Sequence, residues 1–480
     1  MGETHKGVRD MDPFVNSRVY IPNALTHIAH TLTRTYTYGR KKVPCPIDPR
    51  HTVFEHKLEH HLRVCNMKKE AEKLNEQPFY KEGCNAGTTT EAIDGPPIEH
   101  TLPTARVLAT AVLATYSSLF PNDPPLLDLS SAELNAGLIQ SLRQRKIAAG
   151  GTKHVQQQAS IIGHLRRTGL APPLPSAHPA SQPATTPRPT TILEMGAGRG
   201  MLGLLVSGVC GAISAAAVCL TMVERSSVRR KAGAHCDRRD TSKDGVVTSD
   251  YPFDSSGVKS DLVRVDLEHA LLTEVVKDEE RDVVVIAKHL CGAGTDLALR
   301  AVEKIKHYPN LKGICMATCC HGVCDFKHLV GREFLVEQFK TCGNFKLTKS
   351  DFDLMRKWAA ATTADRETEG GKGKESKEAQ EEAQDEHPVE AQTNSKNYVG
   401  AGAVCDSSEF DVTKQTLGRC VQRLIDRARV EYMKNSLNMD GLNEVVYYVS
   451  SDVTPQNALL CGKRSSGKEE EEAPKKQRLN

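Results

Sequence analysis

The sequence predicts an α/β fold built on a parallel, doubly wound sheet. Between residues 191 and 362, apolar segments rich in valine, isoleucine and leucine alternate with helical patterns, as in a strand–helix–strand chain. A glycine-rich turn, Glu194-Met-Gly-Ala-Gly-Arg-Gly, follows the first apolar segment. Polar residues follow the second, third and fourth segments, and in an open parallel sheet the residues after the strands meet at one edge. The sequence therefore places a ligand site at that edge.

Seven strands are expected. The first five are Ile192–Met195, Val218–Val223, Leu262–Val265, Val283–Ala287 and Gly313–Ala317. Glu224 is expected to end the second strand, Asp266 the third and Lys288-His289 the fourth. A helix over Asp411–Lys434 and a hairpin of two strands, Glu444–Ser450 and Asn457–Cys461, are expected to follow later in the chain.

The turn formed by Gly196, Gly198 and Gly200 is suited to binding a ligand through its backbone. Glycines adopt positive φ and let a ligand approach closely, and the helix after them offers unpaired N–H groups. The spacing differs from the G-x-G-x-x-G of dinucleotide sites, and Glu194 would repel a pyrophosphate. The turn therefore favours a cationic ligand. It resembles the first motif of class I (Rossmann-like) S-adenosyl-L-methionine-dependent methyltransferases.

This resemblance implies roles for the polar residues around the turn. The N–H groups of the glycines would contact the methionine part of S-adenosyl-L-methionine, and Glu194 would complement its amino group. Glu224 would accept hydrogen bonds from the ribose hydroxyls, and Asp266 from the adenine amino group. The alternative for these two acids is a solvated carboxylate at the end of a strand.

Lys288 and His289 are the candidate catalytic residues. The (Asp/Asn)-Pro-Pro motif of many amino-group methyltransferases is missing here, and a lysine beside a histidine suits a hydroxyl acceptor. His289 would be the general base and Lys288 would stabilise the alkoxide, or the two roles would be reversed. Further along, Cys319-Cys320-His321 and Cys324 are expected to pack the end of the fifth strand rather than bind a metal, because adjacent cysteines rarely ligate one ion.

A second candidate site lies near the amino end of the chain. Cys45 and His51 lie on a proline-rich, non-helical turn, whereas His61 and Cys65 are four residues apart on a predicted helix face. Two ligands from a turn and two from a helix suit tetrahedral zinc, which so small a module needs in order to fold. The spacing resembles the CHHC finger of a spliceosomal protein and of one tRNA methyltransferase family. Surface cysteines and histidines without metal are the alternative.

Composition divides the rest of the chain. The expected order is a disordered segment 1–40, the zinc finger 41–68, a helical linker region 69–170, a proline-rich linker 171–190, the core 191–362, a disordered acidic insertion 363–408, the end of the core 409–462 and a disordered tail 463–480. No apolar run reaches the length of a membrane span, and no signal-peptide core is seen. The 15 scattered cysteines indicate an intracellular protein of the nucleus or cytoplasm.

Several motifs together resemble the eukaryotic tRNA 2′-O-methyltransferases that act on acceptor-stem nucleotide 4. They are the CHHC module, the Lys153–Ile161 helix with His154 and Gln157, the glycine turn, Lys288-His289-Leu-Cys-Gly and Cys319-Cys320-His321. The resemblance implies methylation of cytidine or adenosine at position 4 of the tRNAs for proline, glycine and histidine. Animal members often carry a further cysteine-rich finger, but the first 44 residues here contain no cysteine.

Two other functions remain compatible with the sequence. One is a methyltransferase with a protein or small-molecule acceptor, because the donor motif says nothing about the acceptor. The other is a non-enzymatic, zinc-dependent RNA-binding adaptor. The intact glycines and strand-end acids argue against the adaptor. The sequence predicts no oligomeric state.

Overall fold

The computed structural model describes residues 41–49, 51–88, 95, 97–135, 152–172, 188–211, 218–226, 259–277, 280–369 and 413–465. They belong to two compact units, Met1–Glu76 and Gln77–Asn480. The predictions of disorder for residues 1–40, for most of the acidic insertion and for residues 466–480 lie outside the described residues, as does most of the 171–190 linker.

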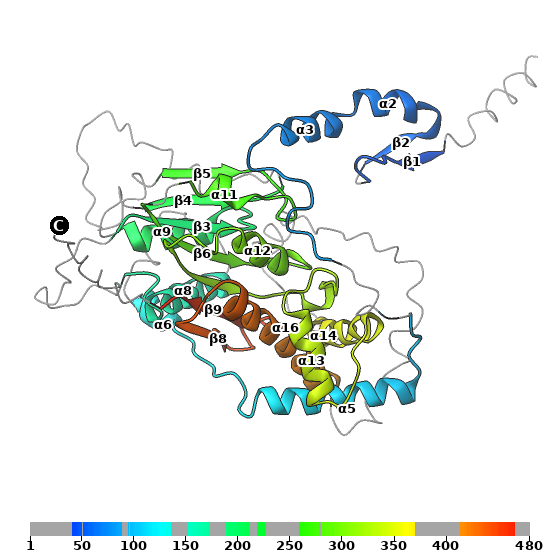
Figure 1. The fold of residues 1–480 in the computed structure, drawn as a ribbon, viewed down its shortest axis with the longest axis vertical. Helices are drawn as coiled ribbons and strands as arrows, with labels where there is room; N and C mark the ends of the chain where they lie inside the picture. Colours follow the sequence, from blue (N-terminus) through cyan, green and yellow to red (C-terminus); the bar gives the residue numbers. More distant parts are fainter. Residues whose placement is uncertain are drawn as a thin grey trace, which may run out of the picture. The chain divides into compact units, whose positions relative to one another are not determined.

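The first unit is a short hairpin followed by helices (Figure 1). Strands β1 (Lys42–Pro44) and β2 (Thr52–Phe54) are antiparallel, and η1 (Glu55–Lys57), α2 (Leu58–Val64) and α3 (Asn66–Asn75) follow. The sequence predicts that Cys65 lies on the same helix as His61. In the structure, Cys65 instead lies between α2 and α3, with φ −57° and ψ 125°. This extended ψ ends α2 at Val64.

The second unit contains a seven-stranded sheet with the order β5-β4-β3-β6-β7-β9-β8. The strands are β3 (Thr190–Met195), β4 (Val218–Val223), β5 (Lys259–Val263), β6 (Asp282–Lys288), β7 (Leu311–Ala317), β8 (Leu442–Tyr447) and β9 (Ala458–Lys463). The first five of these are parallel, and β9 pairs antiparallel with both β7 and β8. The expected mixed α/β fold with a mostly parallel sheet is confirmed.

One strand is displaced from its predicted position. Strand β5 covers Lys259–Val263 instead of Leu262–Val265, because its pairing with β4 ends where Val223 meets Val263. The exposed Lys259 and Asp261 do not fit the apolar pattern that predicts a strand. However, β5 is an edge strand, where charged side chains are tolerated. Asp266 therefore lies in the loop beyond β5 and does not end the strand.

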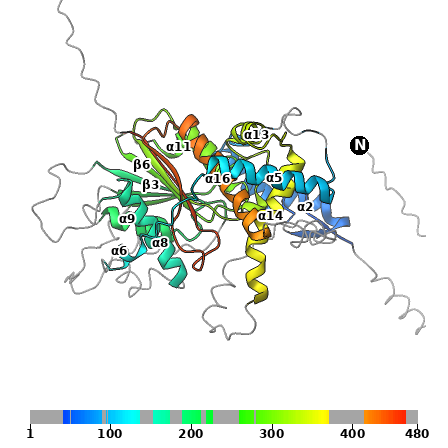
Figure 2. The same cartoon turned by 90° about the horizontal axis from the view of Figure 1, so that it is seen from below.

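Apolar side chains cover both faces of the sheet, as expected for parallel strands. Along β3, Ile192 packs in one apolar cluster and Leu193 in the other, since successive residues of a strand point to opposite faces. Helices α8 (Thr152–Arg167) and α9 (Met201–Gly211) lie on the first face (Figure 2). Helix α12 (Gly294–Glu303) and the end of α16 (Lys414–Ser436) lie on the second. The short helices α6 (Ser130–Asn135) and α11 (Leu272–Val275) flank the sheet.

A separate helical cluster packs beside the sheet. It is formed by α5 (Leu102–Leu119), α13 (Arg332–Thr341), α14 (Lys349–Glu369) and the first part of α16. Helix α14 continues to Glu369, past residue 362, where the sequence predicts that disorder begins. Among the helices of the described residues, none combines the length and apolar character needed to cross a membrane.

Candidate functional site

The glycine turn after β3 leaves room for a ligand. Gly196, Gly198 and Gly200 have φ values of 62°, 52° and 73°, which L side chains rarely adopt. A Cβ at Gly196 would lie 2.2 Å from Leu290 Cδ2, whereas a Cβ at Gly198 would meet no atom within 4 Å. Gly196 therefore packs against the Leu290 side chain, and its positive φ favours glycine, whereas Gly198 faces open space in front of the turn. This space fits the methyl-donor site expected there.

Glu194 lies beneath this turn. Its side chain is 3% exposed, and its Oε2 accepts a hydrogen bond of 3.1 Å from the N–H of Gly203 at the start of α9. Burial raises the pKa of Glu194 to about 8, and the Gly203 N–H and the Lys288 ammonium only partly oppose this shift. The carboxyl group is therefore mostly protonated at neutral pH.

Glu224 directly follows the neighbouring strand β4 and is hydrogen-bonded to the glycine turn. The β3–β4 pairing ends with Met195 opposite Val223, which brings Glu224 beside the glycines. Its Oε2 accepts a hydrogen bond of 2.9 Å from the Gly198 N–H, and its Oε1 accepts one of 2.7 Å from the Ser226 N–H. These bonds fix the carboxylate at the open side of the turn.

Asp266 is connected to this group through a residue that the sequence did not suggest. Its Oδ2 lies 3.2 Å from Arg225 Nη1, and its Oδ1 accepts a hydrogen bond from the Glu268 N–H. Arg225 directly follows Glu224, so the ion pair holds the loop after β5 against the end of β4. The structure thus brings together the ends of β3, β4 and β5.

Lys288 lies on the other side of the turn. It is the last residue of β6, and the β3–β6 pairing places Met195 opposite Ala287, directly before it. Its Nζ lies 3.1 Å from Nδ1 of His154 on α8. The ring of His154 meets that of His289 edge-on, with centroids 6.1 Å apart. His154 was not among the predicted site residues, although it belongs to the helix that carries part of the family resemblance.

His289 turns the chain away from the sheet. Its φ is 65°, in the left-handed region that residues other than glycine seldom occupy. Desolvation, and after it the positive charge of Lys288, holds the pKa of His289 well below its usual range, although the residue is exposed at the surface. The imidazole is therefore neutral at pH 7 and has an available lone pair.

The four predicted zinc ligands converge in the first unit. The ligand atoms of Cys45, His51, His61 and Cys65 all lie within 4.8 Å of one another. His61 Nε2 is 3.2 Å from Cys45 Sγ and 3.0 Å from His51 Nε2, and Cys65 Sγ is 3.8 Å from His51 Nε2. Two sulfurs and two imidazole nitrogens this close suit a tetrahedral zinc ion. Such an ion would hold the hairpin to the end of α2.

A buried charge network joins α12 and α16 to the loop after β7. Asp426 Oδ1 lies 2.8 Å from His321 Nε2 and 3.3 Å from Arg429 Nη1, and Arg429 also pairs with Asp296 at 2.7 Å. Burial alone would raise the pKa of Asp426, but His321, Arg423 and Arg429 outweigh it and lower the pKa to about 2. The imidazole of His321 is thus paired with the carboxylate of Asp426.

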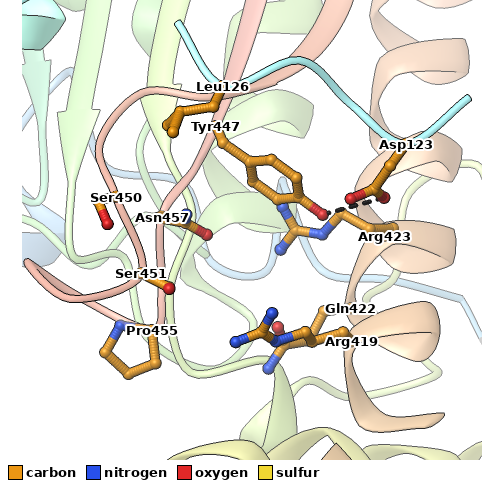
Figure 3. A pocket seen from close by; sticks show the side chains of 10 residues that line it. All are labelled: Asp123, Leu126, Arg419, Gln422, Arg423, Tyr447, Ser450, Ser451, Pro455 and Asn457. Carbon is orange, nitrogen blue, oxygen red and sulfur yellow. Dashed lines mark hydrogen bonds between the residues drawn. The ribbon is translucent and has the colours of Figure 1, made fainter. Parts of the chain in front are cut away.

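A polar pocket lies along the same edge of the sheet, where the β8–β9 loop faces α16 (Figure 3). It is lined by Asp123, Leu126, Arg419, Gln422, Arg423, Tyr447, Ser450, Ser451, Pro455 and Asn457. The Tyr447 hydroxyl donates to Asp123 at 3.3 Å. Arg423 is 2% exposed and pairs with Asp426, but its Nη1 has no hydrogen-bond partner among the described residues.

Comparison with known proteins gives two family matches. Residues 156–463 match the family described as Methyltransferase TRM13, and residues 42–66 match the U11-48K-like CHHC zinc finger. A Saccharomyces cerevisiae protein named tRNA:m(4)X modification enzyme TRM13 is 25% identical over 448 residues, which cover 88% of this chain and 84% of that protein. The Homo sapiens protein named as its homolog is 25% identical over 478 residues, covering 88% and 86%. A Mus musculus homolog is 24% identical over 474 residues, with the same shares.

Proposed function

Because the chain belongs to the TRM13 methyltransferase family, we propose that it is an S-adenosyl-L-methionine-dependent tRNA 2′-O-methyltransferase. The relatives are named for tRNA modification, and the proposed target is cytidine or adenosine at position 4 of the acceptor stem of the tRNAs for proline, glycine and histidine. One observation carries the proposal: the open turn at Gly198 and the Lys288–His154 pair flank the end of β3.

We assign the sheet to the class I, Rossmann-like methyltransferases. Support comes from its parallel strands, from the glycine turn after β3 and from the final antiparallel strands β8 and β9. The proposed core remains 191–362 and 409–462, with β3 beginning at Thr190, α14 continuing to Glu369 and β9 ending at Lys463. The nucleus or cytoplasm remains the proposed compartment, on the basis of the 15 scattered cysteines of the sequence.

The residues around the turn would hold the donor, which supplies an activated methyl group when bound. In the structure the Gly196 N–H donates to the Val223 carbonyl oxygen at 2.8 Å, the Gly200 N–H to the Ala197 carbonyl oxygen at 2.7 Å, and the Gly198 N–H to Glu224 at 2.9 Å. The donor would therefore contact the open backbone at Gly198 and the carboxylate of Glu224. Glu194 would complement the donor's amino group from below. Asp266, held by Arg225, is assigned to the adenine amino group.

Lys288, His154 and His289 would manage the proton of the acceptor hydroxyl. A protonated Lys288 can only donate, so Nδ1 of His154 accepts its hydrogen bond and the proton of His154 sits on Nε2. The neutral ring of His289 can accept the hydroxyl proton, while the Lys288 ammonium stabilises the developing oxyanion. Placing the hydroxyl in line with the methyl group supplies much of the remaining acceleration.

The pocket of Figure 3 offers a contact for the RNA backbone. A 2′-hydroxyl in an acceptor stem is reached from the shallow minor groove, through shape and phosphate contacts. Arg419 is exposed in the pocket, and the hydroxyls of Ser450 and Ser451 line it on the opposite side. A guanidinium suits a phosphate group, and the nearby Ser450 hydroxyl donates to Asp452 at 3.2 Å.

The test is transfer of radiolabel from S-adenosyl-L-methionine to total tRNA, followed by nucleoside analysis. Wild-type protein should label 2′-O-methylcytidine or 2′-O-methyladenosine. Gly198→Asp, which puts a carboxylate into the open space of the turn, should abolish labelling by preventing donor binding. Lys288→Met should keep donor binding and lower the rate by about 10²- to 10⁴-fold. Lys312→Met, which removes a lysine from the opposite end of the sheet, is the matched control.

Other outcomes would overturn the assignment. Label that appears in protein, or survives RNase treatment of the substrate, would mean a different acceptor. A protein that binds tRNA and zinc but neither binds nor uses the donor would be an adaptor with a methyltransferase fold.

A further inference from the structure

Three cysteines outside the zinc finger gather between two loops of the sheet edge. Cys291 follows β6, and Cys319 and Cys320 follow β7. Cys291 Sγ lies 3.3 Å from Cys319 Sγ and 3.1 Å from Cys320 Sγ, and all three sulfurs lie within 4.8 Å of one another. The cluster differs from the one that the sequence indicates, because His321 is bound to Asp426 and Cys324 to Arg429.

The backbone explains how adjacent cysteines can face the same point. In extended chain, neighbouring side chains point to opposite faces, so Cys319 and Cys320 would diverge. Cys320 instead has φ 46° and ψ 42°, in the left-handed region, and this turns its sulfur back toward Cys319. Such backbone is rare for a residue other than glycine and persists only where its surroundings demand it.

The two loops are also fastened to each other. Gly292 has φ 63°, and a Cβ there would lie 3.3 Å from the Val323 carbonyl oxygen. The Cys324 thiol donates to the Gly292 carbonyl oxygen at 3.6 Å. The loop after β6 and the loop after β7 are therefore held close, with the cluster between them.

The zinc finger of the same chain provides an internal comparison. Neighbouring ligand atoms of that site are 3.0 to 3.8 Å apart, and the sulfurs of the three-cysteine cluster have the same spacing. We propose that Cys291, Cys319 and Cys320 form a second metal site that binds a thiophilic divalent ion of the zinc type. Three sulfurs without an oxygen ligand select such an ion over magnesium or calcium.

Burial suggests the form of the site. Cys319 is 4% exposed, Cys320 is half-buried and Cys291 is exposed, so the cluster opens to solvent on the Cys291 side. Among the described residues no histidine or carboxylate joins the cluster, which leaves one coordination position to solvent or to a bound molecule. A metal there would tie the loop that carries Lys288 and His289 to the end of β7.

Metal content of the full-length protein, purified under reducing conditions, tests this site independently of methyl transfer. Elemental analysis should find two zinc ions per chain in the wild type and one in Cys45→Ser, which disables only the finger. Cys291→Ser should retain one zinc, and the double variant none. Cys342→Ser, at the end of α13 and outside both clusters, should retain two.

Cobalt substitution gives a second readout. In the Cys45→Ser background, Co²⁺ should produce thiolate-to-metal charge-transfer absorption, which disappears on addition of Cys291→Ser. A wild-type chain with one zinc that is lost completely in Cys45→Ser would overturn the proposal. So would intact-mass analysis showing a disulfide of Cys291 in place of bound metal. The zinc content of Cys45→Ser therefore tests the second site even if a variant of the three-cysteine cluster fails to fold.

Discussion

At the residue scale, Glu194 combines burial with a position under the proposed donor site. Its pKa in the folded protein is about 8, against 4.5 when unperturbed. Between these two values the folded state binds more protons than the unfolded state, so this group lowers stability as pH rises through that window. A ligand that brings a positive charge to the carboxyl would favour its ionised form and displace the proton.

We therefore predict that donor binding at pH 7 releases about one proton from Glu194. Isothermal titration calorimetry in two buffers with different heats of ionisation measures the released proton directly. Glu194→Gln should bind without this release, and Glu274→Gln, on α11 at the periphery, should behave like the wild type. Equal proton release by wild type and Glu194→Gln would contradict the assigned role.

Individual site residues differ in how visible they are in the sequence. Glu194, Glu224 and Lys288 could be located because each lies in or next to the last residues of an apolar strand. His154 could not, since its 3.1 Å contact with Lys288 joins positions 134 residues apart. That contact depends on how α8 packs on the sheet, which no local pattern encodes.

At the element scale, α16 carries charges into the interior. The sequence predicts its apolar stripe, which includes Leu417, Val421 and Leu424, and the structure confirms that these are buried. It does not predict that Asp426 and Arg429 are also fully buried. Partners from α12 and from the short helix η5 (His321–Val323) make this possible, and those partners are known only once the fold is assembled.

Asp426→Asn should lower the free energy of unfolding by about 3–5 kcal/mol, because it leaves buried cations without their counter-charge. Urea unfolding at pH 7 measures the change. Asp261→Asn, on the exposed edge strand, should change it by less than about 0.5 kcal/mol. Since the pKa of Asp426 is lowered from 3.8 to about 2, its contribution is complete above pH 3.8 and is lost as pH falls through 2. An Asp426→Asn variant with the same free energy of unfolding as the wild type would contradict this account.

A separate prediction concerns tRNA binding at the pocket beside α16. Arg419→Ala should weaken tRNA binding by about tenfold. It should also lower the slope of log Kd against log salt concentration by the amount that corresponds to about one phosphate contact. Filter binding across a series of salt concentrations measures both. Arg427→Ala is the matched control on the same helix, because Arg427 is paired with Glu431 and does not line the pocket. Equal losses for the two variants would argue against a phosphate in the pocket.

At the scale of the whole molecule, the zinc finger and the methyltransferase domain form distinct compact units. The finger has very little apolar core of its own, since η1 and α2 contain no buried residue. We therefore expect its fold to depend on a bound metal ion. The second unit has large apolar clusters on both faces of its sheet and needs no metal from the finger.

Cys65→Ser should therefore unfold the finger and leave donor affinity unchanged. Hydrogen exchange should show lost protection in residues 42–66 alone, and calorimetry should give a wild-type dissociation constant for S-adenosyl-L-methionine. Methyl transfer to tRNA should fall if the finger contacts the RNA. His56→Ala, in the same module but outside the ligand set, is the control. Loss of donor binding in Cys65→Ser would show that the units are not independent.

The fold class was predictable as a whole because alternating apolar strands and helices favour few arrangements. The position of β9 between β7 and β8 was not, since the predicted hairpin does not specify which of its strands pairs with β7. The extension of α14 to Glu369 was also missed, because the composition after residue 362 is compatible with both disorder and helix.

The place of β9 has a consequence for synthesis on the ribosome. Until Ala458–Lys463 leave the exit tunnel, the outer edge of β7 has no partner strand, and its backbone groups are open to other chains. This edge is therefore closed only after every proposed active-site residue has been translated. A chain that ends before Ala458 would contain all of those residues and still be prone to aggregate.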